Sequence, residues 1–174
     1  MASSYYPAAS YDRLVTAITL CLWIGLIALT AFFYYLFLFS PLDSLILGIT
    51  IVSIITALTA GILAIPFLFS PRGYRLTSTE LIIQRPVRNI AIPYNQIIEI
   101  NQLNWIWKGI RLAGSGGLYG YLGLFYLSGV GKVWMYVTNK NKMILVKCIN
   151  DKQYAISPNS IVFLTEVKDK LAIK

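Results

Sequence analysis

Two long uncharged stretches constrain what the first half of this chain can fold into. They run over Leu14–Leu42 and Ser44–Pro71, and Asp43 is the one charged residue between them. A helix needs roughly 20 apolar residues to cross the ~30 Å hydrocarbon core of a bilayer, so each stretch is long enough to span it. Serine and proline beside Asp43 are typical of a turn. The sequence therefore predicts a transmembrane helical hairpin at residues 14–71, with helices at about 14–39 and 44–70.

A cleaved signal peptide is the alternative interpretation of the first stretch. Ala28–Ala31 loosely fits a cleavage site with small residues. The apolar run continues beyond this site through Phe32–Phe39, whereas removable segments normally have a shorter apolar core. We therefore favour an uncleaved membrane helix.

Basic residues near the helix ends indicate the orientation of the hairpin. Arg13 precedes the first helix, and Arg72 and Arg75 follow the second, while the connecting turn has no basic residue. Lys and Arg concentrate on the cytoplasmic side of membrane helices. We predict a two-helix, multi-pass protein of the cell (inner) membrane with both termini cytoplasmic, including a cytoplasmic N-terminal segment at residues 1–13.

Residues 72–174 differ in composition from the hairpin and form the expected cytoplasmic domain. They contain 14 of the 15 Lys and Arg residues and 5 of the 7 Asp and Glu residues. About 100 residues are enough for one small domain with its own core. Because this domain is basic and tethered, we expect anionic membrane lipids as its electrostatic partners. Nucleic acid is the alternative, but the charges are scattered rather than clustered, so we expect no nucleic-acid partner.

The sequence offers little material for catalysis or metal binding. It contains no His, and its two cysteines, Cys21 and Cys148, lie in an apolar run and a predicted strand. The acidic residues of the domain are far apart in sequence and have no recognisable nucleophile or base beside them. The apolar stretches carry no ionisable residue in mid-membrane, which argues against transport by this chain alone. We expect no enzyme activity, no catalytic residue, no cofactor and no metal.

Short alternating apolar segments predict a β-rich domain that ends in a helix. Leu164, Val167 and Leu171 would share one helical face, with Ser157 as the N-cap and Pro158 in the first helical position. About seven short strands at near-regular spacing are typical of a barrel or sandwich. The predicted strands are 73–76, 81–85, 89–93, 97–100, 133–137, 143–148 and 153–156.

Four sequence segments resemble the bacterial pleckstrin-homology (PH-like) domain family. They are GYRLTSTELIIQRPVRNIAIPYNQIIEI, RLAGSGGLYGYLGLFY, VWMYVTNKNKMILVK and QYAISP. The resemblance implies a split β-barrel of about seven antiparallel strands with a C-terminal helix, in a membrane-associated domain. The expected fold class is thus a membrane α hairpin plus an α+β soluble domain. Eukaryotic relatives bind phosphoinositides through basic residues of the first hairpin, but the turn Thr77–Glu80 has no Lys or Arg.

The segment 104–131, rich in glycine and aromatic residues, is predicted to be an apolar loop of the domain at 72–174. Loops of this length are usually functional, and an exposed apolar surface usually marks a membrane or partner contact. The alternative is that the loop folds back and fills the core of the domain. The candidate membrane or partner contacts are Trp105, Trp107, Leu118, Tyr119, Tyr121, Leu124 and Phe125.

Basic residues near the membrane are candidates for contact with lipid headgroups. The alternative is ordinary positive charge on solvated strand faces. The candidates are Arg72, Arg75, Arg85, Arg88, Lys108 and Arg111.

These observations favour a non-enzymatic, membrane-anchored interaction or scaffold module at the cytoplasmic face of the membrane. Its expected partner is a membrane-bound protein or a second copy of the chain. One alternative is a module that senses anionic lipids with its basic, membrane-proximal face. A further alternative is an accessory subunit of a membrane enzyme or transporter.

Overall fold

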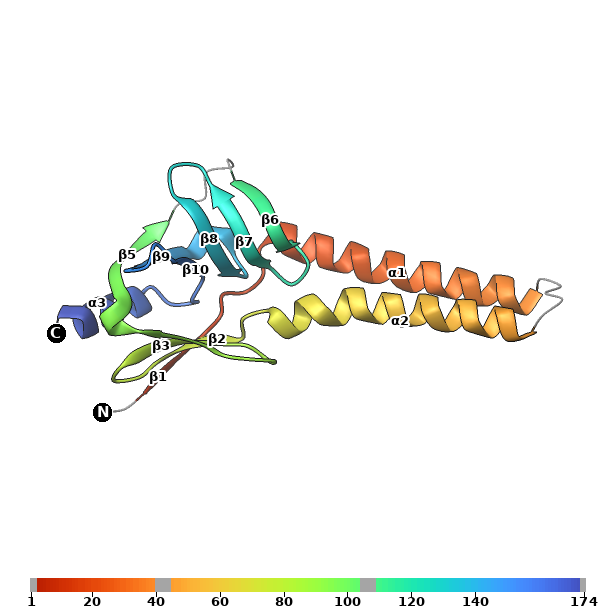
Figure 1. Cartoon of the computed structure of the whole chain (residues 1–174), viewed down its shortest axis with the longest axis horizontal. Coiled ribbons are helices and arrows are strands. Elements are labelled where there is room, and N and C mark those ends of the chain that lie inside the picture. Colours follow the sequence, from red (N-terminus) through yellow and green to blue (C-terminus); the bar gives the residue numbers. More distant parts are fainter. Residues whose placement is uncertain (1–2, 40–44, 104–108, 173–174) are drawn as a thin grey trace.

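The structure, a computed structural model, describes residues 3–39, 45–103 and 109–172. It consists of a β-rich domain from which a pair of long helices projects (Figure 1). The predicted turn between the helices, and the residues Trp105, Trp107 and Lys108, lie outside the described residues.

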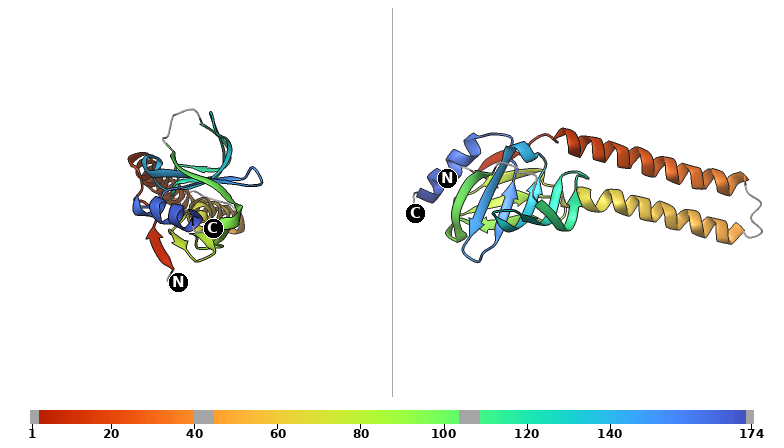
Figure 2. Two further views of the ribbon diagram at one scale, coloured as in Figure 1. Left: turned by 90° about the vertical axis from the view of Figure 1, so that its left-hand side faces the viewer. Right: turned by 90° about the horizontal axis from the view of Figure 1, so that it is seen from above.

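The two projecting helices are the predicted hairpin. Helix α1 covers Arg13–Phe39 and helix α2 covers Leu45–Phe69. They lie side by side in all views (Figure 2), and the Thr30 and Thr59 hydroxyls are 3.1 Å apart between them. Both are long and apolar enough to cross a membrane, and few of their residues are buried, unlike those of a soluble core helix. The two candidate membrane spans indicate a membrane protein.

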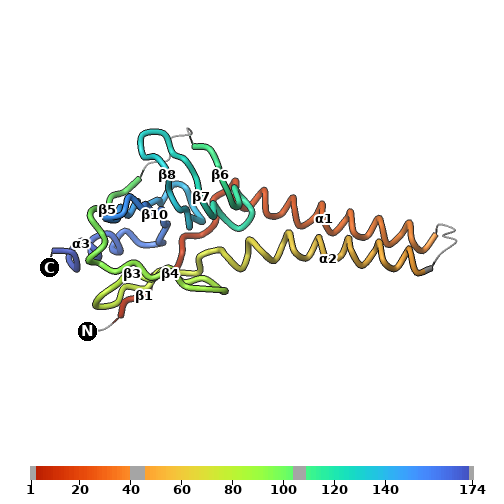
Figure 3. The backbone as a smooth tube through the Cα atoms, in the orientation of Figure 1, coloured from red at the N-terminus to blue at the C-terminus, as the bar shows by residue number. Residues whose placement is uncertain are grey.

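The first sheet has four antiparallel strands in the order β1-β2-β3-β4. Strand β1 precedes α1 in the chain, whereas β2 follows α2, and the two pair from Ser4–Leu76 to Pro7–Gly73. The helical hairpin is therefore an insertion between two neighbouring strands of one sheet, as the trace in Figure 3 shows. The strands are β1 (Ser4–Pro7), β2 (Gly73–Leu76), β3 (Glu80–Gln84) and β4 (Ile90–Pro93).

The residues between β1 and α1 are fastened to the domain. Ala9 N donates to Ser157 O at 2.8 Å, and Thr138 Oγ1 donates to Ala9 O at 2.6 Å. The buried Asp12 caps α1, since its Oδ1 accepts from Val15 N at 2.9 Å. The N-terminal segment is thus part of the folded domain, so the two domain-side ends of the hairpin meet in one body.

The second sheet has six strands in the order β5-β9-β10-β8-β7-β6. All neighbours are antiparallel except β10 and β8, which pair in parallel. The described residues thus form ten strands, more than the predicted seven, and not every pair is antiparallel. The strands are β5 (Ile97–Leu103), β6 (Gly109–Gly116), β7 (Tyr121–Leu127), β8 (Gly131–Val137), β9 (Met143–Cys148) and β10 (Gln153–Ile156).

The prediction of a loop over 104–131 is wrong for most of its described part, because β6 and β7 form a hairpin there. Gly114 and Gly123 face each other with φ of 113° and 110°. A Cβ on Gly114 would lie 2.0 Å from Leu122 O, and one on Gly123 would lie 2.4 Å from Ala113 O. The glycines therefore serve a close approach of two strands and do not indicate a flexible connection.

The main core lies between the sheets and is covered by helix α3 (Val162–Ala172). At its centre the fully buried Tyr74 donates its hydroxyl to Tyr136 O at 2.8 Å and accepts from Ser157 N at 3.0 Å. Burial raises the pKa of Tyr74 to about 12. A second core on the six-stranded sheet includes Val15, so the base of α1 is packed into the domain.

Helix α3 begins later than predicted. Ser160 Oγ accepts from Val162 N at 3.3 Å and occupies the capping position. The predicted cap, Ser157, is buried, and its Oγ accepts from Thr138 N at 2.9 Å. Two sheets closed by a C-terminal helix nevertheless confirm the predicted fold class.

Glu166 of α3 ties the two ends of the chain together. Its carboxylate accepts hydrogen bonds from Ser4 Oγ, at 2.7 Å, and from the Tyr6 hydroxyl, and it lies 3.8 Å from Lys170 Nζ. Burial acts to raise the pKa of Glu166, but the bonds from Tyr6 and Ser4 and the charge of Lys170 hold it below its ordinary value. The Glu166 carboxylate also raises the pKa of Tyr6 to about 12.

We expect Glu166→Gln to lower the melting temperature of the detergent-solubilised chain at pH 7. Because the folded-state pKa of Glu166 is depressed, its contribution to stability is present above the unfolded pKa of about 4.3 and lost as the pH falls below it. The difference between wild type and variant should therefore shrink between about pH 5 and pH 3. Asp169→Asn, on the exposed face of α3, is the matched control. A difference that stays constant with pH would contradict this role.

Candidate membrane-interface site

The turn between β6 and β7 contacts the bases of both helices. Tyr119 N donates to Thr19 Oγ1 at 3.2 Å, and the Tyr119 hydroxyl accepts from Trp23 Nε1 at 2.7 Å. On the α2 side, Ser70 Oγ donates to Tyr119 O at 3.0 Å, and the rings of Tyr119 and Phe67 pack edge to face at 5.4 Å. We call Tyr119 with these four partners the interface clamp.

The backbone of this turn explains its glycines. Tyr119 has a φ of 55°, and Gly117 and Gly120 have φ of 137° and 131°, a region that glycine adopts at little cost. A Cβ on Gly117 would lie 2.5 Å from Ile18 Cδ1, and one on Gly120 would lie 2.5 Å from Val137 O. Gly117 therefore allows the turn to approach α1 closely, and Gly120 allows it to approach the end of β8.

Arg85 is placed differently from the other predicted basic residues. It is half-buried, and its guanidinium lies over the rings of Tyr136, at 5.1 Å, and Phe69, at 5.5 Å. Its Nε donates to Arg88 O at 2.7 Å. The turn that carries it is fastened to α2, since Val87 N donates to Leu68 O at 3.4 Å. Arg85 is thus held at the point where the domain meets the end of α2.

The remaining described candidates, Arg72, Arg75, Arg88 and Arg111, are exposed. Arg72 lies over the Phe67 ring at 4.2 Å. The ion pairs found among the described residues join Lys147 to Glu99 and Lys170 to Glu166, so no candidate arginine there is paired with a carboxylate.

A cavity of about 450 Å³ opens where α2 meets the second sheet. Arg85 is its charged residue, and two aromatic side chains of β8, Trp134 and Tyr136, lie beside it. Burial raises the pKa of Tyr136, and the charge of Arg85 opposes this rise. The lining residues are Ile65, Pro66, Phe69, Arg85, Gly114, Ser115, Leu122, Gly123, Trp134 and Tyr136.

Most of the predicted membrane or partner contacts that the structure describes lie inside the fold. Tyr121 and Phe125 belong to the second core, and Leu118 and Tyr119 are also buried. Leu124 is half-buried. These placements correspond to the core-filling alternative, with Tyr119 also holding the helices.

The exposed apolar side chains of this region are ones that sequence reasoning did not select. Ile110 is 68% exposed, and Leu112 and Tyr126 are each 49% exposed. Ile110 and Tyr126 are directly opposite each other on β6 and β7. An alternation of side chains on the two faces of a strand through 109–127 would have predicted β6 and β7. The glycines carry no side chain and therefore hide this alternation in the sequence.

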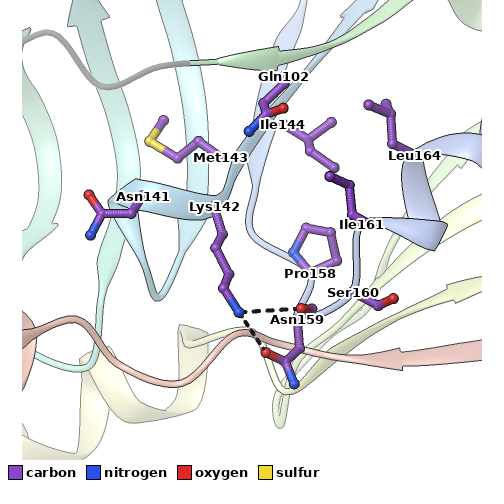
Figure 4. A pocket seen from close by; sticks show the side chains of 10 residues that line it. All are labelled: Gln102, Asn141, Lys142, Met143, Ile144, Pro158, Asn159, Ser160, Ile161 and Leu164. Carbon is purple, nitrogen blue, oxygen red and sulfur yellow. Dashed lines mark hydrogen bonds between the residues drawn. The ribbon is translucent and has the colours of Figure 1, made fainter.

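A second cavity, of about 320 Å³, lies between the start of β9 and the segment before α3 (Figure 4). Lys142 Nζ there donates to Asn159 Oδ1 at 3.0 Å and to Asn159 O at 3.4 Å. Its lining contains no carboxylate, Cys or His, and the Ser160 hydroxyl already caps α3. Within the described residues, no cluster of His, Cys, Asp and Glu could hold a metal ion. This cavity therefore presents no acid–base pair for catalysis.

Comparison with known proteins identifies the family. Residues 72–171, more than half of the chain, match the family model of the bacterial PH domain, so the chain belongs to that family, as its motifs predicted. PH domains are generally non-catalytic interaction modules. The chain is also similar to an uncharacterized protein of Clostridium acetobutylicum, with 36% identity over 72 residues, which are 41% of this chain and 24% of that protein. It thus spans about a quarter of that relative's length. No solved structure matches the chain.

We expect Tyr119→Ala to destabilise the full-length chain in mild detergent by about 3 kcal/mol, because truncation of a buried aromatic residue costs about 3–5 kcal/mol. Tyr119→Phe removes only the bond with Trp23 and should cost about 1 kcal/mol. Thermal unfolding followed by circular dichroism measures both effects.

Tyr126→Ala, on the same hairpin, is the matched control for the loss of a tyrosine ring. Its side chain is half exposed, so its effect should stay below about 1 kcal/mol. Equal destabilisation by Tyr119→Ala and Tyr126→Ala would show that the interface clamp has no special role.

Proposed function

We propose that this protein is a non-enzymatic, membrane-anchored interaction module at the cytoplasmic face of the membrane, which docks an extended protein segment along strand β6. The supporting observation is that β6 ends the order of the six-stranded sheet. Its outer edge has no strand partner among the described residues, and all its residues are exposed except the half-buried Ser115.

The composition of β6 supports docking rather than protection of this edge. Natural proteins usually blunt an exposed edge strand with charges, proline or a covering segment. Strand β6 has eight residues and one charge, Arg111, and it exposes Ile110 and Leu112. An added strand gains main-chain hydrogen bonds from such an edge and specificity from alternate side chains. Tyr126, opposite Ile110 on β7, extends the apolar surface that a partner would cover.

The helical hairpin favours binding of a partner because it restricts the orientation of the domain. The interface clamp and the paired strands β1 and β2 hold the domain against both helix ends. A domain fixed in this way loses less orientational freedom when it binds a partner in the same membrane. The basic residues Arg13 and Arg72, at the domain ends of the helices, support a cytoplasmic position.

A photo-reactive amino acid at Leu112 tests docking on β6. We expect ultraviolet irradiation of membranes that contain this variant to give one discrete adduct, either with a second copy or with a protein partner, identified by its mass and peptides. The same group at Ile161, which is 74% exposed before α3, is the control and should give none. The added substitution Ile110→Lys should reduce the Leu112 adduct at least tenfold, because a charge on the edge opposes strand addition. No adduct at Leu112, or an equal adduct at Ile161, would overturn the proposal.

The cytoplasmic position has a separate test. In a variant with Cys21 and Cys148 replaced by Ser, we expect a new cysteine at Ile161 to resist a membrane-impermeant maleimide in intact cells and to react after permeabilisation. Labelling in intact cells would place the domain on the outer side.

A further inference from the structure

We propose that the cavity between α2 and the second sheet binds one anionic phospholipid of the adjacent leaflet, with the phosphate at Arg85 and an acyl chain along α2. This inference does not depend on protein docking at β6, because the cavity includes only Gly114 and Ser115 near the end of that strand, while the docking residues Ile110, Leu112 and Tyr126 do not line it.

The length of the helices places the cavity at the depth of the lipid headgroups. With 27 and 25 residues, α1 and α2 are about 40 Å and 37 Å long at 1.5 Å per residue. Both exceed the ~30 Å hydrocarbon core, α1 by about two turns and α2 by about one and a half turns. Arg13 and Arg72 mark the domain end as the polar one, and the Trp23–Tyr119 pair at that end is typical of a membrane interface. The last turns of α2, with Ile65, Pro66 and Phe69, then lie among the headgroups.

Arg85 has the geometry needed to bind a phosphate. Its Nε donates to Arg88 O, and its guanidinium lies over the rings of Phe69 and Tyr136, which restrict its position. No hydrogen bond or ion pair with a carboxylate occupies its terminal nitrogens among the described residues. A pre-oriented guanidinium binds phosphate oxygens by paired, charge-assisted hydrogen bonds.

A second hollow along α2 offers a path for an acyl chain. It has a volume of about 370 Å³ and shares Ile65 and Pro66 with the cavity of Arg85, so the two adjoin each other along α2. Gly61 lines it, and a Cβ there would meet nothing within 4 Å. The hollow runs from the headgroup level toward the bilayer centre, and its other lining residues are Ala57, Leu58 and Ile62.

The combination of the Arg85 charge with apolar walls favours a lipid over a soluble anion as the ligand of this cavity. A free phosphate would use Arg85 alone and would gain nothing from the apolar walls formed by Trp134, Leu122 and Ile65. An anionic lipid uses both the charge and the apolar surface, and it is present at high concentration at this depth. The net positive charge of residues 72–174 further favours an anionic headgroup over a zwitterionic one.

Native mass spectrometry of the delipidated full-length chain in mild detergent tests the site. The probes are dioleoyl phosphatidylglycerol, dioleoyl phosphatidylcholine and glycerol 1-phosphate. We expect the chain to retain phosphatidylglycerol at least tenfold more tightly than phosphatidylcholine, and glycerol 1-phosphate to be unable to displace it at equal concentration.

Two variants and one control separate the contribution of the Arg85 charge from that of the cavity. Arg85→Gln should weaken phosphatidylglycerol binding about tenfold, whereas Arg75→Gln, an equal loss of charge at the exposed position of β2, should change it less than twofold. Ile65→Trp fills the cavity from an exposed position and should reduce binding with Arg85 intact. With each variant compared with itself in the absence of lipid, phosphatidylglycerol should raise the melting temperature of wild type more than that of Arg85→Gln.

Each alternative outcome overturns a stated part of the proposal. Equal losses in Arg75→Gln and Arg85→Gln would indicate diffuse surface charge instead of a site. Unchanged binding in Ile65→Trp would show that the lipid does not occupy the cavity. Equal retention of the two lipids would show that the headgroup charge has no role. Displacement by glycerol 1-phosphate would identify a site for free phosphate esters rather than for a lipid.

Discussion

The pairing of β1 with β2 is the interaction on which the rest of the structure depends. These strands are neighbours in one sheet although the entire helical hairpin lies between them in the chain. Because both ends of the hairpin are held by the same sheet, the helix bases cannot separate without the loss of four cross-strand pairs. Loop closure over such a distance costs free energy that grows only slowly with loop length, and helices that associate in a bilayer shorten the effective loop. The hairpin and the sheet thus stabilise each other.

This arrangement makes the helical hairpin a rigid support for the domain instead of a flexible tether. A domain joined to the membrane by one linker can rotate freely, but here Asp12 caps α1 inside the domain, and Tyr119 bonds to Thr19 and Trp23 of α1 and to Ser70 after α2. The domain is therefore fixed at three places around the helix bases. A fixed orientation gives Arg85 and β6 defined positions relative to the bilayer. A ligand or partner in the same membrane therefore meets them in one orientation.

The parts of the fold that sequence reasoning predicted are those with strong local signals. The uncharged runs gave both helices, and alternation gave β2, β9 and β10 with their observed bounds. Strand β1 was missed because four residues ending in proline carry almost no local signal, and their partner lies beyond the hairpin. Arg85 was among the candidates, but no property of the sequence distinguished it from Arg75 or Arg88. Its position depends on a long-range bond, from Val87 N to Leu68 O, and on rings from α2 and β8.

The glycines of β6 and β7 explain why one hairpin can serve the core, the helices and the cavity at once. A side chain at Gly117 would collide with Ile18 of α1, and one at Gly120 would collide with the backbone of Val137, so the turn would have to shift away from α1 and from β8. Side chains at Gly114 and Gly123 would separate the two strands. These two residues also line the cavity, so part of its wall is bare backbone. A composition that is typical of a loop is therefore the physical condition for bringing a sheet this close to two membrane helices.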